Sequence, residues 1–514
     1  MGQLRFLALT LLLFLFYTCS AQNWEWAKNK SNYDDDHVPS LAIDRQGNVY
    51  LPITNLLDDS LTCTAATAAG YLLKYGSNGA CIWSTPTLGK ALVVAADSTD
   101  NLYVLSSISD SIFVTKMDLN GQVKWDKLFK RKYGLLKSQE MTVSGNGTIF
   151  IAGEFGDTLS IDTCSIVSST QTAAYAACID SDGICRWLKK LDIAPNGIAS
   201  DAQQNIYLTG FITDTVLIEG NTVPCLGGSD IVLCSYDKNG ALNWVTRAGS
   251  DAFNISARFD GGNAIAVSPA NEIFITGNFI DTAYFDSSSI ISNGGNDIFV
   301  AKYSNLGNVV WVRGFGANSD DEGYSISADN DGNCYVGGRH VFYMEMDGIG
   351  VPWLKNYDLF VAKLNSIGSV ERVSSAVGKP WNENVTGLAA SGTTIFATGV
   401  FYDTAYFGLD TLYGTGVGNI FLAKVSADLT ALPSFSEGLL SVYPNPSTGL
   451  LMVNNAPAGV SKAEIHGIDG RLVSQQEVSE ERTAVDVSFL PNGVYLCVLT
   501  NQHEKRVARF VKQE

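Results

Sequence analysis

Residues 237–244, with the sequence Asp-Lys-Asn-Gly-Ala-Leu-Asn-Trp, contain the most regular feature of this chain, a turn glycine followed four residues later by a tryptophan. Asn-Gly and Asp-Gly pairs are typical of β-hairpin turns. The same spacing occurs in five copies: Gly79/Trp83, Gly121/Trp125, Gly183/Trp187, Gly240/Trp244 and Gly307/Trp311. A sixth copy keeps Gly368 but has Arg372 at the tryptophan position. The pattern predicts a repeated strand that begins just after a tight turn.

An apolar strand with an aromatic residue just after a turn is the second repeated feature. We call these residues the landmark aromatics, and there are seven of them, 47 to 67 residues apart: Tyr50, Tyr103, Phe150, Tyr207, Phe274, Tyr335 and Phe396. An Asp-Thr pair follows in four copies: Asp157-Thr158, Asp214-Thr215, Asp281-Thr282 and Asp403-Thr404. We expect this pair to start a second strand, an apolar run such as residues 297–300 to form a third, and the Gly…Trp segment to form the fourth.

Repeats of this length, built from short strands, are typical of propeller blades or stacked arrays. Propellers usually contain four to eight blades, so seven copies fit a closed ring. We therefore predict an all-β chain in which residues 22–432 form a seven-bladed β-propeller of four-stranded antiparallel blades. A stacked solenoid or a different number of blades is the alternative.

The last repeat has no Gly…Trp strand of its own. A matching strand occurs near the other end of the chain, at residues 24–28, where Trp26 takes the place of the repeat tryptophan. This N-terminal strand would complete the last blade and remove an open strand edge. We expect it to close the ring.

The repeats resemble the bacterial β-propeller repeat family called SBBP, whose copies read roughly D-x-x-G-N-x-Y-x-x-G. The copies with the best match are residues 44–53 and 329–338, and the resemblance covers about residues 24–430. These motifs are structural. The resemblance therefore implies a fold and no reaction.

Residues 1–21 have the features of a secretory signal peptide: Arg5, a long apolar run, and small residues before a cleavage site between Ala21 and Gln22. An alternative is a lipoprotein acylated at Cys19. No other segment approaches 18 consecutive apolar residues, so we expect no transmembrane helix. The mature protein is expected to be secreted or held at the outer cell surface.

Nine cysteines remain after the predicted cleavage, and an exported chain can form disulfides. Local candidate pairs are Cys178 with Cys185, Cys63 with Cys81, and Cys225 with Cys234. The connectivity does not follow from the sequence, and buried free thiols are an equal alternative.

The repeat pattern ends near residue 432, and residues 436–514 differ in composition, with seven basic and eight acidic side chains in the last 75 residues. Short strands are predicted at residues 440–443, 450–453, 463–466, 471–474, 483–487, 494–499 and 506–512. Seven strands in this length predict a small β-sandwich. A generic adhesion module is one interpretation of such a sandwich.

Three ordered motifs in this tail resemble the sorting domain of the type IX secretion system. The matching residues include Tyr443, Pro444, Asn445, Pro446, Gly449, Gly470, Arg471, Pro491, Gly493 and Tyr495. The resemblance implies that the signal peptide takes the protein across the inner membrane and that the type IX machinery takes it across the outer membrane. It also implies that the tail is usually removed, and that the protein is released or attached to lipopolysaccharide.

The composition excludes several classes of function. With 34 Lys and Arg against 52 Asp and Glu, the formal net charge is −18, which disfavours a nucleic-acid partner. Only four histidines are present, and no HExxH, GxSxG, P-loop or clustered Cys/His motif occurs, so we predict no catalytic residues, metal or cofactor. Residues 329–333 resemble part of a calcium loop but lack its distal Glu, and a structural turn is favoured.

The sequence therefore favours a non-enzymatic, exported scaffold that binds an unknown protein or glycan. Trp353 and Trp381 fall outside the repeat pattern and are the candidate ligand surface, together with residues 251–262 and 339–355, which interrupt the period. The alternative is an extracellular polysaccharide hydrolase or lyase that uses Asp and Glu on one propeller face. A weak cation site at residues 34–37 and a structural role in a surface layer are further alternatives.

Overall fold

The computed structural model describes residues 24–31, 40–54, 68–109, 111–133, 140–170, 172–252, 259–351, 353, 357–378, 383–392, 394–408, 410–414, 418–426, 441–443, 447–454, 462–467, 472–477, 483–500 and 505–513. The predicted signal peptide, with Ala21 and Gln22, lies outside these residues. The described elements are all strands. They divide into two compact units, Met1–Asp428 and Leu429–Glu514. Within the described ranges, no helix of a length and hydrophobicity suited to crossing a membrane is found.

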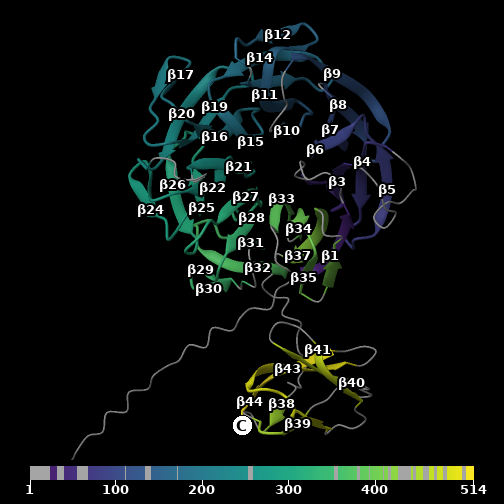
Figure 1. Ribbon diagram of the computed structural model, residues 1–514. Coiled ribbons are helices and arrows are strands. Elements are labelled where there is room, and N and C mark those ends of the chain that lie inside the picture. The colour runs from purple at the N-terminus through teal and green to yellow at the C-terminus, as the bar shows by residue number, and fades with distance from the viewer. Residues whose placement is uncertain are drawn as a thin grey trace, which may run out of the picture. The chain divides into compact units, whose positions relative to one another are not determined.

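The N-terminal unit contains four-stranded antiparallel groups, which we number as modules 1 to 7 along the chain. The modules follow one another around a common centre, with the first strand of each nearest the centre and the fourth at the rim (Figure 1). Module 1 contains β2 (Ala42–Ile43), β3 (Val49–Thr54), β4 (Gly70–Tyr75) and β5 (Cys81–Pro86). Module 2 contains β6 (Lys90–Ala96), β7 (Asn101–Ile108), β8 (Ser111–Asp118) and β9 (Val123–Tyr133). Module 3 contains β10 (Glu140–Val143), β11 (Ile149–Ile161), β13 (Ala173–Ile179) and β14 (Cys185–Leu191).

The remaining modules repeat this order. Module 4 contains β15 (Ala194–Ser200), β16 (Ile206–Ile212), β19 (Asp230–Tyr236) and β20 (Leu242–Gly249). Module 5 contains β21 (Gly261–Val267), β22 (Ile273–Phe279), β25 (Asp297–Tyr303) and β26 (Val309–Phe315). Module 6 contains β27 (Glu322–Ala328), β28 (Cys334–Val341), β31 (Tyr357–Leu364) and β32 (Val370–Gly378). Module 7 contains β33 (Asn384–Ser391), β34 (Thr394–Phe401), β37 (Asn419–Ser426) and β1 (Trp24–Ser31).

Module 7 is completed from the other end of the chain. Strand β1 pairs antiparallel with β37, with Trp24 opposite Val425 and Lys28 opposite Leu422. The predicted pairing of the N-terminal strand with the last repeat is therefore confirmed.

An extra hairpin follows the second strand of modules 3 to 7. These hairpins are formed by the end of β11 with β12 (Cys164–Val167), β17 (Val216–Ile218) with β18 (Asn221–Val223), β23 (Thr282–Phe285) with β24 (Ser288–Ile291), β29 (Met344–Met346) with β30 (Ile349–Val351), and β35 (Thr404–Phe407) with β36 (Asp410–Tyr413). Strands β11, β23 and β35 pair with the fourth strand of the preceding module, which covers part of its open edge.

The hairpins correct the predicted strand order. The Asp-Thr pairs lead into the hairpins: β23 and β35 start at the threonine, β17 starts one residue later, and in module 3 the pair lies within β11. The first strand of each module lies before the landmark aromatic instead. Five of these first strands, β6, β15, β21, β27 and β33, contain a β-bulge that interrupts their alternation, as between Pro195 and Gly197 in β15 and between Gly262 and Ala264 in β21, so the sequence pattern does not reveal them.

The landmark aromatics form the centre of each module. All seven lie on second strands and are at most 1% exposed. In the four tyrosine copies the hydroxyl donates to an aspartate six residues earlier: Tyr50 to Asp44, Tyr103 to Asp97, Tyr207 to Asp201 and Tyr335 to Asp329. Two of the phenylalanine copies, Phe150 and Phe274, have Ser144 and Ser268 at this position. A buried hydroxyl needs a hydrogen-bond partner, so the aspartate accompanies tyrosine and not phenylalanine.

The repeat tryptophans connect neighbouring modules. Each indole Nε1 donates to a backbone carbonyl in the turn between the third and fourth strands of the next module, at 2.9–3.2 Å: Trp26 to Ser77, Trp83 to Leu119, Trp125 to Ser181, Trp187 to Lys238, Trp244 to Asn305 and Trp311 to Ser366. The turn glycine lies against the same ring: a Cβ added to Gly307 would lie 2.7 Å from the Trp244 ring. This explains the Gly…Trp pattern as contacts between modules.

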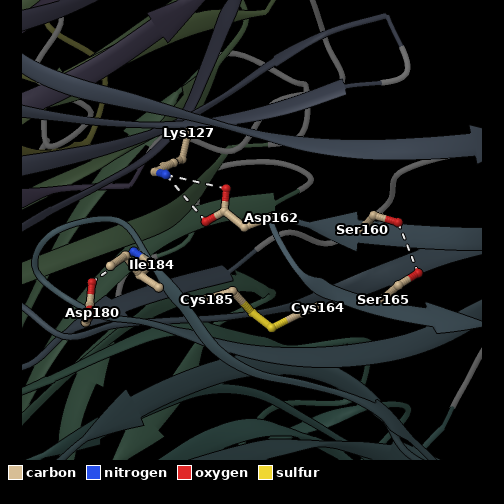
Figure 2. The surroundings of a disulfide bond; sticks show 8 residues. All are labelled: Lys127, Ser160, Asp162, Cys164, Ser165, Asp180, Ile184 and Cys185. Atoms are coloured by element: carbon tan, nitrogen blue, oxygen red, sulfur yellow. Dashed lines mark hydrogen bonds and ion pairs between the residues drawn. A yellow bond between two sulfur atoms is a disulfide. The ribbon is translucent and has the colours of Figure 1, made fainter.

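A disulfide joins Cys164 on β12 to Cys185 on β14 and ties the hairpin of module 3 to its fourth strand (Figure 2). The candidate pair Cys178–Cys185 is therefore wrong, because the register places Ile179, not Cys178, opposite Cys185. The pair Cys225–Cys234 is also wrong.

The thiols of Cys178, Cys225 and Cys234 are free. Cys81 is disulfide-bonded, and Cys63 lies outside the described residues.

The C-terminal unit consists of two antiparallel sheets around one apolar core. The first contains β38 (Ser441–Tyr443), β39 (Leu450–Asn454) and β42 (Thr483–Asp486). The second contains β41 (Leu472–Glu477), β40 (Lys462–Gly467), β43 (Gly493–Thr500) and β44 (Lys505–Lys512). Both sheets contribute to the core, for example through Leu451, Val485, Ile465 and Phe510. Each of these strands overlaps one of the predicted strands of the tail.

Candidate functional site

Comparison of the repeats with one another singles out module 6. Where four modules have Asp-Thr after the second strand, module 6 has Phe342-Tyr343. Asp157 and Asp281 have φ angles of 56° and 51°, and Phe342 keeps this left-handed backbone with a φ of 69°. Aspartate tolerates the left-handed region, but a bulky residue there is a strained outlier. A strained aromatic on an exposed turn points to a functional role.

His340 holds this turn in place. It replaces the buried phenylalanine that modules 3, 5 and 7 have at the same offset, and it is fully buried. Its Nδ1 lies 3.0 Å from the carbonyl oxygen of Phe342. Burial lowers the pKa of His340 to about 4, so the ring is neutral, and Nδ1 carries the proton that it donates to the carbonyl.

Three aromatic residues gather around this turn, and we call Phe342, Tyr343 and Trp353 the module 6 aromatic patch. The side chains of Phe342 and Tyr343 are 44% and 58% exposed, and Trp353 is half-buried. The rings of Phe342 and Trp353 contact each other, with centroids 5.0 Å apart. Exposed aromatic clusters of this kind mark binding surfaces on soluble proteins.

The hydroxyl end of the Tyr343 ring lies beside Gly350 of the hairpin β29–β30. A Cβ added to Gly350 would lie 2.4 Å from the Tyr343 hydroxyl oxygen and 3.1 Å from its ring. The hydroxyl donates to Oε1 of Glu345, at 3.2 Å, and Glu345 pairs across the hairpin with Gly350. The buried side chains of Met344 and Met346 anchor the same hairpin in the core. The result is a fixed aromatic ring beside an exposed carboxylate.

Arg339 lies three residues before Phe342, on β28. Its Nε and Nη2 atoms lie 2.9 and 2.6 Å from Oε2 of Glu322, and its guanidinium lies 4.0 Å from the ring centroid of Tyr357. The hydroxyl of Tyr324 also donates to Glu322. The Arg339 charge is therefore balanced within the protein, and this network supports β28 beneath the patch.

Buried carboxyl groups occupy the junctions between modules. Asp260 and Asp321 precede the first strands of modules 5 and 6, and each accepts backbone hydrogen bonds, for example Asp321 from Val341 at 2.7 Å. Glu383 takes the same place before module 7, but it is fully buried and neither of its carboxyl oxygens has a hydrogen-bond partner. Burial, with the negative charges of Asp358 and Asp403, raises the pKa of Glu383 to about 9. This carboxyl is protonated at neutral pH and shielded from solvent.

The residues singled out from the sequence are distributed as follows. Trp353 belongs to the aromatic patch, whereas Trp381 and residues 34–37 lie outside the described residues. Residues 339–355 were expected to interrupt the period, but the hairpin β29–β30 has counterparts in other modules. The residue types, and not an insertion, distinguish this segment. Aligning the Asp-Thr positions across the repeats would have found Phe342 and Tyr343.

The segment with partial similarity to a calcium loop is a turn. The Asp329 carboxylate accepts the backbone N–H groups of Asp331 and Asn333, both at 2.9 Å, as well as the Asn333 side chain and the Tyr335 hydroxyl. In the described ranges, no three or more His, Cys, Asp or Glu side chains are grouped so that they could hold a metal ion.

Four of the sorting-motif residues have described positions around β39 and β43. Gly449 precedes β39, and Gly493 begins β43. The Tyr495 hydroxyl donates to the carbonyl of Pro491 at 3.0 Å, and the Tyr495 ring stacks on Phe510. The backbone of Tyr443 ends β38. Pro444, Asn445, Pro446, Gly470 and Arg471 lie outside the described residues.

Comparison with known proteins identifies the tail and gives distant structural likenesses for the chain. Residues 441–513 match the family described as secretion system C-terminal sorting domain. No curated protein matches the chain significantly.

Among solved structures, virginiamycin B lyase from Staphylococcus aureus is 11% identical, with a TM-score of 0.41, covering 78% of this chain and 99% of the other. PorZ, a surface component of the type IX secretion system of Porphyromonas gingivalis, is 11% identical, with a TM-score of 0.35, covering 94% of this chain and 60% of the other. Drosophila Plexin A, solved with Semaphorin 1b, is 8% identical, with a TM-score of 0.40, covering 79% of this chain and 88% of the other.

The family match agrees with the sorting motifs of the tail. Such a domain implies contact with the type IX secretion machinery and export to the cell surface or the extracellular space. This chain is therefore similar, in residues 441–513, to proteins that the type IX system sorts.

Proposed function

We propose that this protein is an exported, non-enzymatic β-propeller that binds a protein or glycan outside the cell. In this proposal modules 1 to 7 are the seven blades of a closed ring, and the two sheets of the C-terminal unit form a β-sandwich. The sandwich delivers the propeller through the type IX system after a signal peptide has taken the chain across the inner membrane. The propeller then acts as a rigid scaffold.

The module 6 aromatic patch is the observation that carries the binding role. Modules 3, 4, 5 and 7 have the polar pair Asp-Thr at this turn, whereas module 6 keeps the left-handed backbone with an aromatic residue and exposes its rings. An exposed aromatic patch at a turn that is polar in these four modules supports a ligand surface there.

Most carboxyl groups with a strongly raised pKa are shielded from a substrate. Burial raises the pKa of Asp297 to about 7, that of Asp321 to about 6 and that of Glu383 to about 9, and these three are at most 1% exposed, so none of them can contact a polysaccharide. Burial also raises the pKa of Glu140 to about 7, but this residue on β10 is only partly buried, and it is the carboxyl group to substitute in a test for hydrolysis. A general acid must lie within hydrogen-bond reach of its substrate.

Binding is tested with purified protein, residues 22–514, applied to host cells from which the gene has been deleted. We expect saturable binding to the cell surface that falls at least tenfold in the double variant Phe342→Ala/Trp353→Ala. Tyr284→Ala removes a similarly exposed aromatic, 51% exposed, from the hairpin of module 5 and is the matched control. Turnover of a polysaccharide that a single Asp or Glu substitution abolishes would contradict the non-enzymatic role.

Delivery is tested by removing residues 436–514. We expect the truncated protein to accumulate in the periplasm, which fractionation and immunoblotting would detect. Normal surface display without the tail would contradict the sorting role.

A further inference from the structure

We propose that the hairpin β29–β30 binds a neutral glycan, with a pyranose ring stacked on Tyr343 and a sugar hydroxyl donating to Glu345. This inference rests on the proposed function, and it names the ligand class of the same aromatic patch.

The exposure of Tyr343 is the first argument. The residue is 58% exposed, and the hydroxyl end of its ring lies beside Gly350 on the hairpin. One face of a pyranose presents C–H groups, which are apolar and carry a weak positive charge. The face of an aromatic ring is negative, so the two surfaces are complementary in shape and in charge.

The position of Glu345 is the second argument. Its Oε1 lies 3.2 Å from the Tyr343 hydroxyl oxygen, so a carboxylate flanks the stacking ring. An ionised carboxylate has several lone-pair sites, and one hydrogen bond from Tyr343 leaves acceptor capacity for a sugar hydroxyl. Hydrogen bonds to an ionised acceptor are stronger than neutral ones. An apolar face beside a charged acceptor matches a ring with C–H groups on its face and O–H groups at its rim.

Charge and size select the ligand class. The chain has a formal net charge of −18, and a carboxylate lies at the centre of the site, so an anionic glycan would be repelled. A stable protein interface uses about 20–30 residues on each side. The features that distinguish module 6 are the three rings of the aromatic patch and the carboxylate of Glu345. Together they form a surface large enough for about one to three sugar rings.

Module 5 supplies an internal control for this argument. Tyr284 is also exposed on a hairpin, but it lies opposite Ser289, whereas in module 6 Gly350 lies opposite Glu345. Tyr284 therefore has neither the glycine nor the carboxylate that define the site on β29–β30.

A glycan array tests the inference with purified protein, residues 22–514. The neutral probes are cello-, xylo-, manno-, malto-, laminari- and chito-oligosaccharides, and the anionic probes are alginate, polygalacturonate and heparin fragments. We expect binding to at least one neutral series and to no anionic probe. In titration calorimetry with the bound glycan, Tyr343→Ala should lower affinity at least tenfold. Gly350→Ala should have a smaller effect, because its Cβ moves the Tyr343 hydroxyl away from Glu345. Tyr284→Ala should leave affinity unchanged, and circular dichroism melting checks that each variant is folded.

Several results would overturn the inference: no binding to any neutral probe, binding only to anionic probes, or unchanged affinity in folded Tyr343→Ala. If the protein binds gene-deleted cells but no neutral probe, the proposed binding function is supported and the assignment of a neutral glycan is contradicted. If the protein does not bind the cells either, the binding function and the glycan assignment are both contradicted.

Discussion

Modules 1 to 6 and module 7 differ in how their outer strands are connected. In modules 1 to 6 a tight turn joins the third strand to the fourth, whereas in module 7 these strands are β37 and β1, from opposite ends of the chain. Module 7 therefore offers no such turn to its neighbour. The neighbour that would contact this turn is module 6, and its fourth strand has Arg372 in place of the repeat tryptophan.

This difference shows what the repeat tryptophans do. Six tryptophans donate an indole hydrogen bond to a turn of the next module. One of the six is Trp26 on β1, which belongs to module 7 and donates to the turn of module 1. The tryptophan is absent where the turn to receive it is absent. These residues therefore serve the junctions between modules more than the interior of their own sheet.

The largest expected effect is at the closing strand. Trp24 is 8% exposed, donates from Nε1 to the carbonyl of Ser375 at 3.0 Å, and packs on Phe407. We expect Trp24→Ala to lower the free energy of unfolding by about 3–5 kcal/mol in urea titrations, because it opens a cavity at the ring closure. Glu25→Ala removes only a partly exposed ion pair with Lys424, and its expected cost is below about 1 kcal/mol. Equal costs for the two variants would contradict closure by β1.

The docking role of the tryptophans predicts a second, somewhat smaller effect. Trp311→Ala should cost about 3 kcal/mol, because it removes a buried ring and the hydrogen bond to Ser366. Arg372→Trp should give no gain in stability, because module 7 has no turn to receive the indole. Both are measured by urea unfolding at neutral pH. A stabilised Arg372→Trp variant would show that the tryptophan acts within its own sheet.

The junction between modules 6 and 7 predicts a pH dependence. Because the folded-state pKa of Glu383 is raised to about 9, its contribution to stability is complete below the unfolded pKa, near 4.5, and is lost as pH rises through about 9. We expect the melting temperature to fall over this window. Glu383→Gln should flatten the profile, because the amide does not ionise in this pH range.

Glu383→Asp is the matched variant, because Asp260 and Asp321 occupy the same place in other junctions. The shorter side chain should reach backbone amides as theirs do, and the loss at high pH should shrink. A profile identical to that of the native protein in both variants would remove Glu383 as its cause.

The smallest expected effect is in the tyrosine–aspartate turns. Burial alone would raise the pKa of Asp97, but hydrogen bonds from Asn101 and Thr99 lower it overall. The stabilisation is therefore present above the unfolded pKa and is lost as pH falls through the lower folded pKa. Tyr103→Phe should cost about 1 kcal/mol at pH 7 and less in acid. Tyr103→Phe combined with Asp97→Ser, which copies the Ser144/Phe150 pair of module 3, should recover part of the loss.

Features with a local cause could be predicted from the sequence. The landmark aromatics, the Gly…Trp turns and the strands of the tail depend on turn residues and apolar alternation within a few positions. The closing strand was also predictable, because a repeat with one strand missing and a matching strand near residue 24 are both visible in the sequence. The first strands were not predicted, and in five of them a β-bulge disturbs the alternation of apolar residues.

Other features depend on which segments meet in space. Cys185 pairs with Cys164 and not with the nearer Cys178, because the register between β13 and β14 decides which side chain faces it. The contact between Tyr343 and Gly350 depends on the hairpin β29–β30, and the unpaired carboxyl of Glu383 depends on a junction between modules. The sequence by itself determined the repeat and the destination of the protein, because these are encoded by residues close together in the chain or by a recognisable tail. It also determined the closing strand, because the strand missing from the last repeat matches the segment near residue 24. Only the tertiary structure decided the aromatic patch and the buried carboxyl, because burial, strain and cross-strand contacts are properties of packed neighbours.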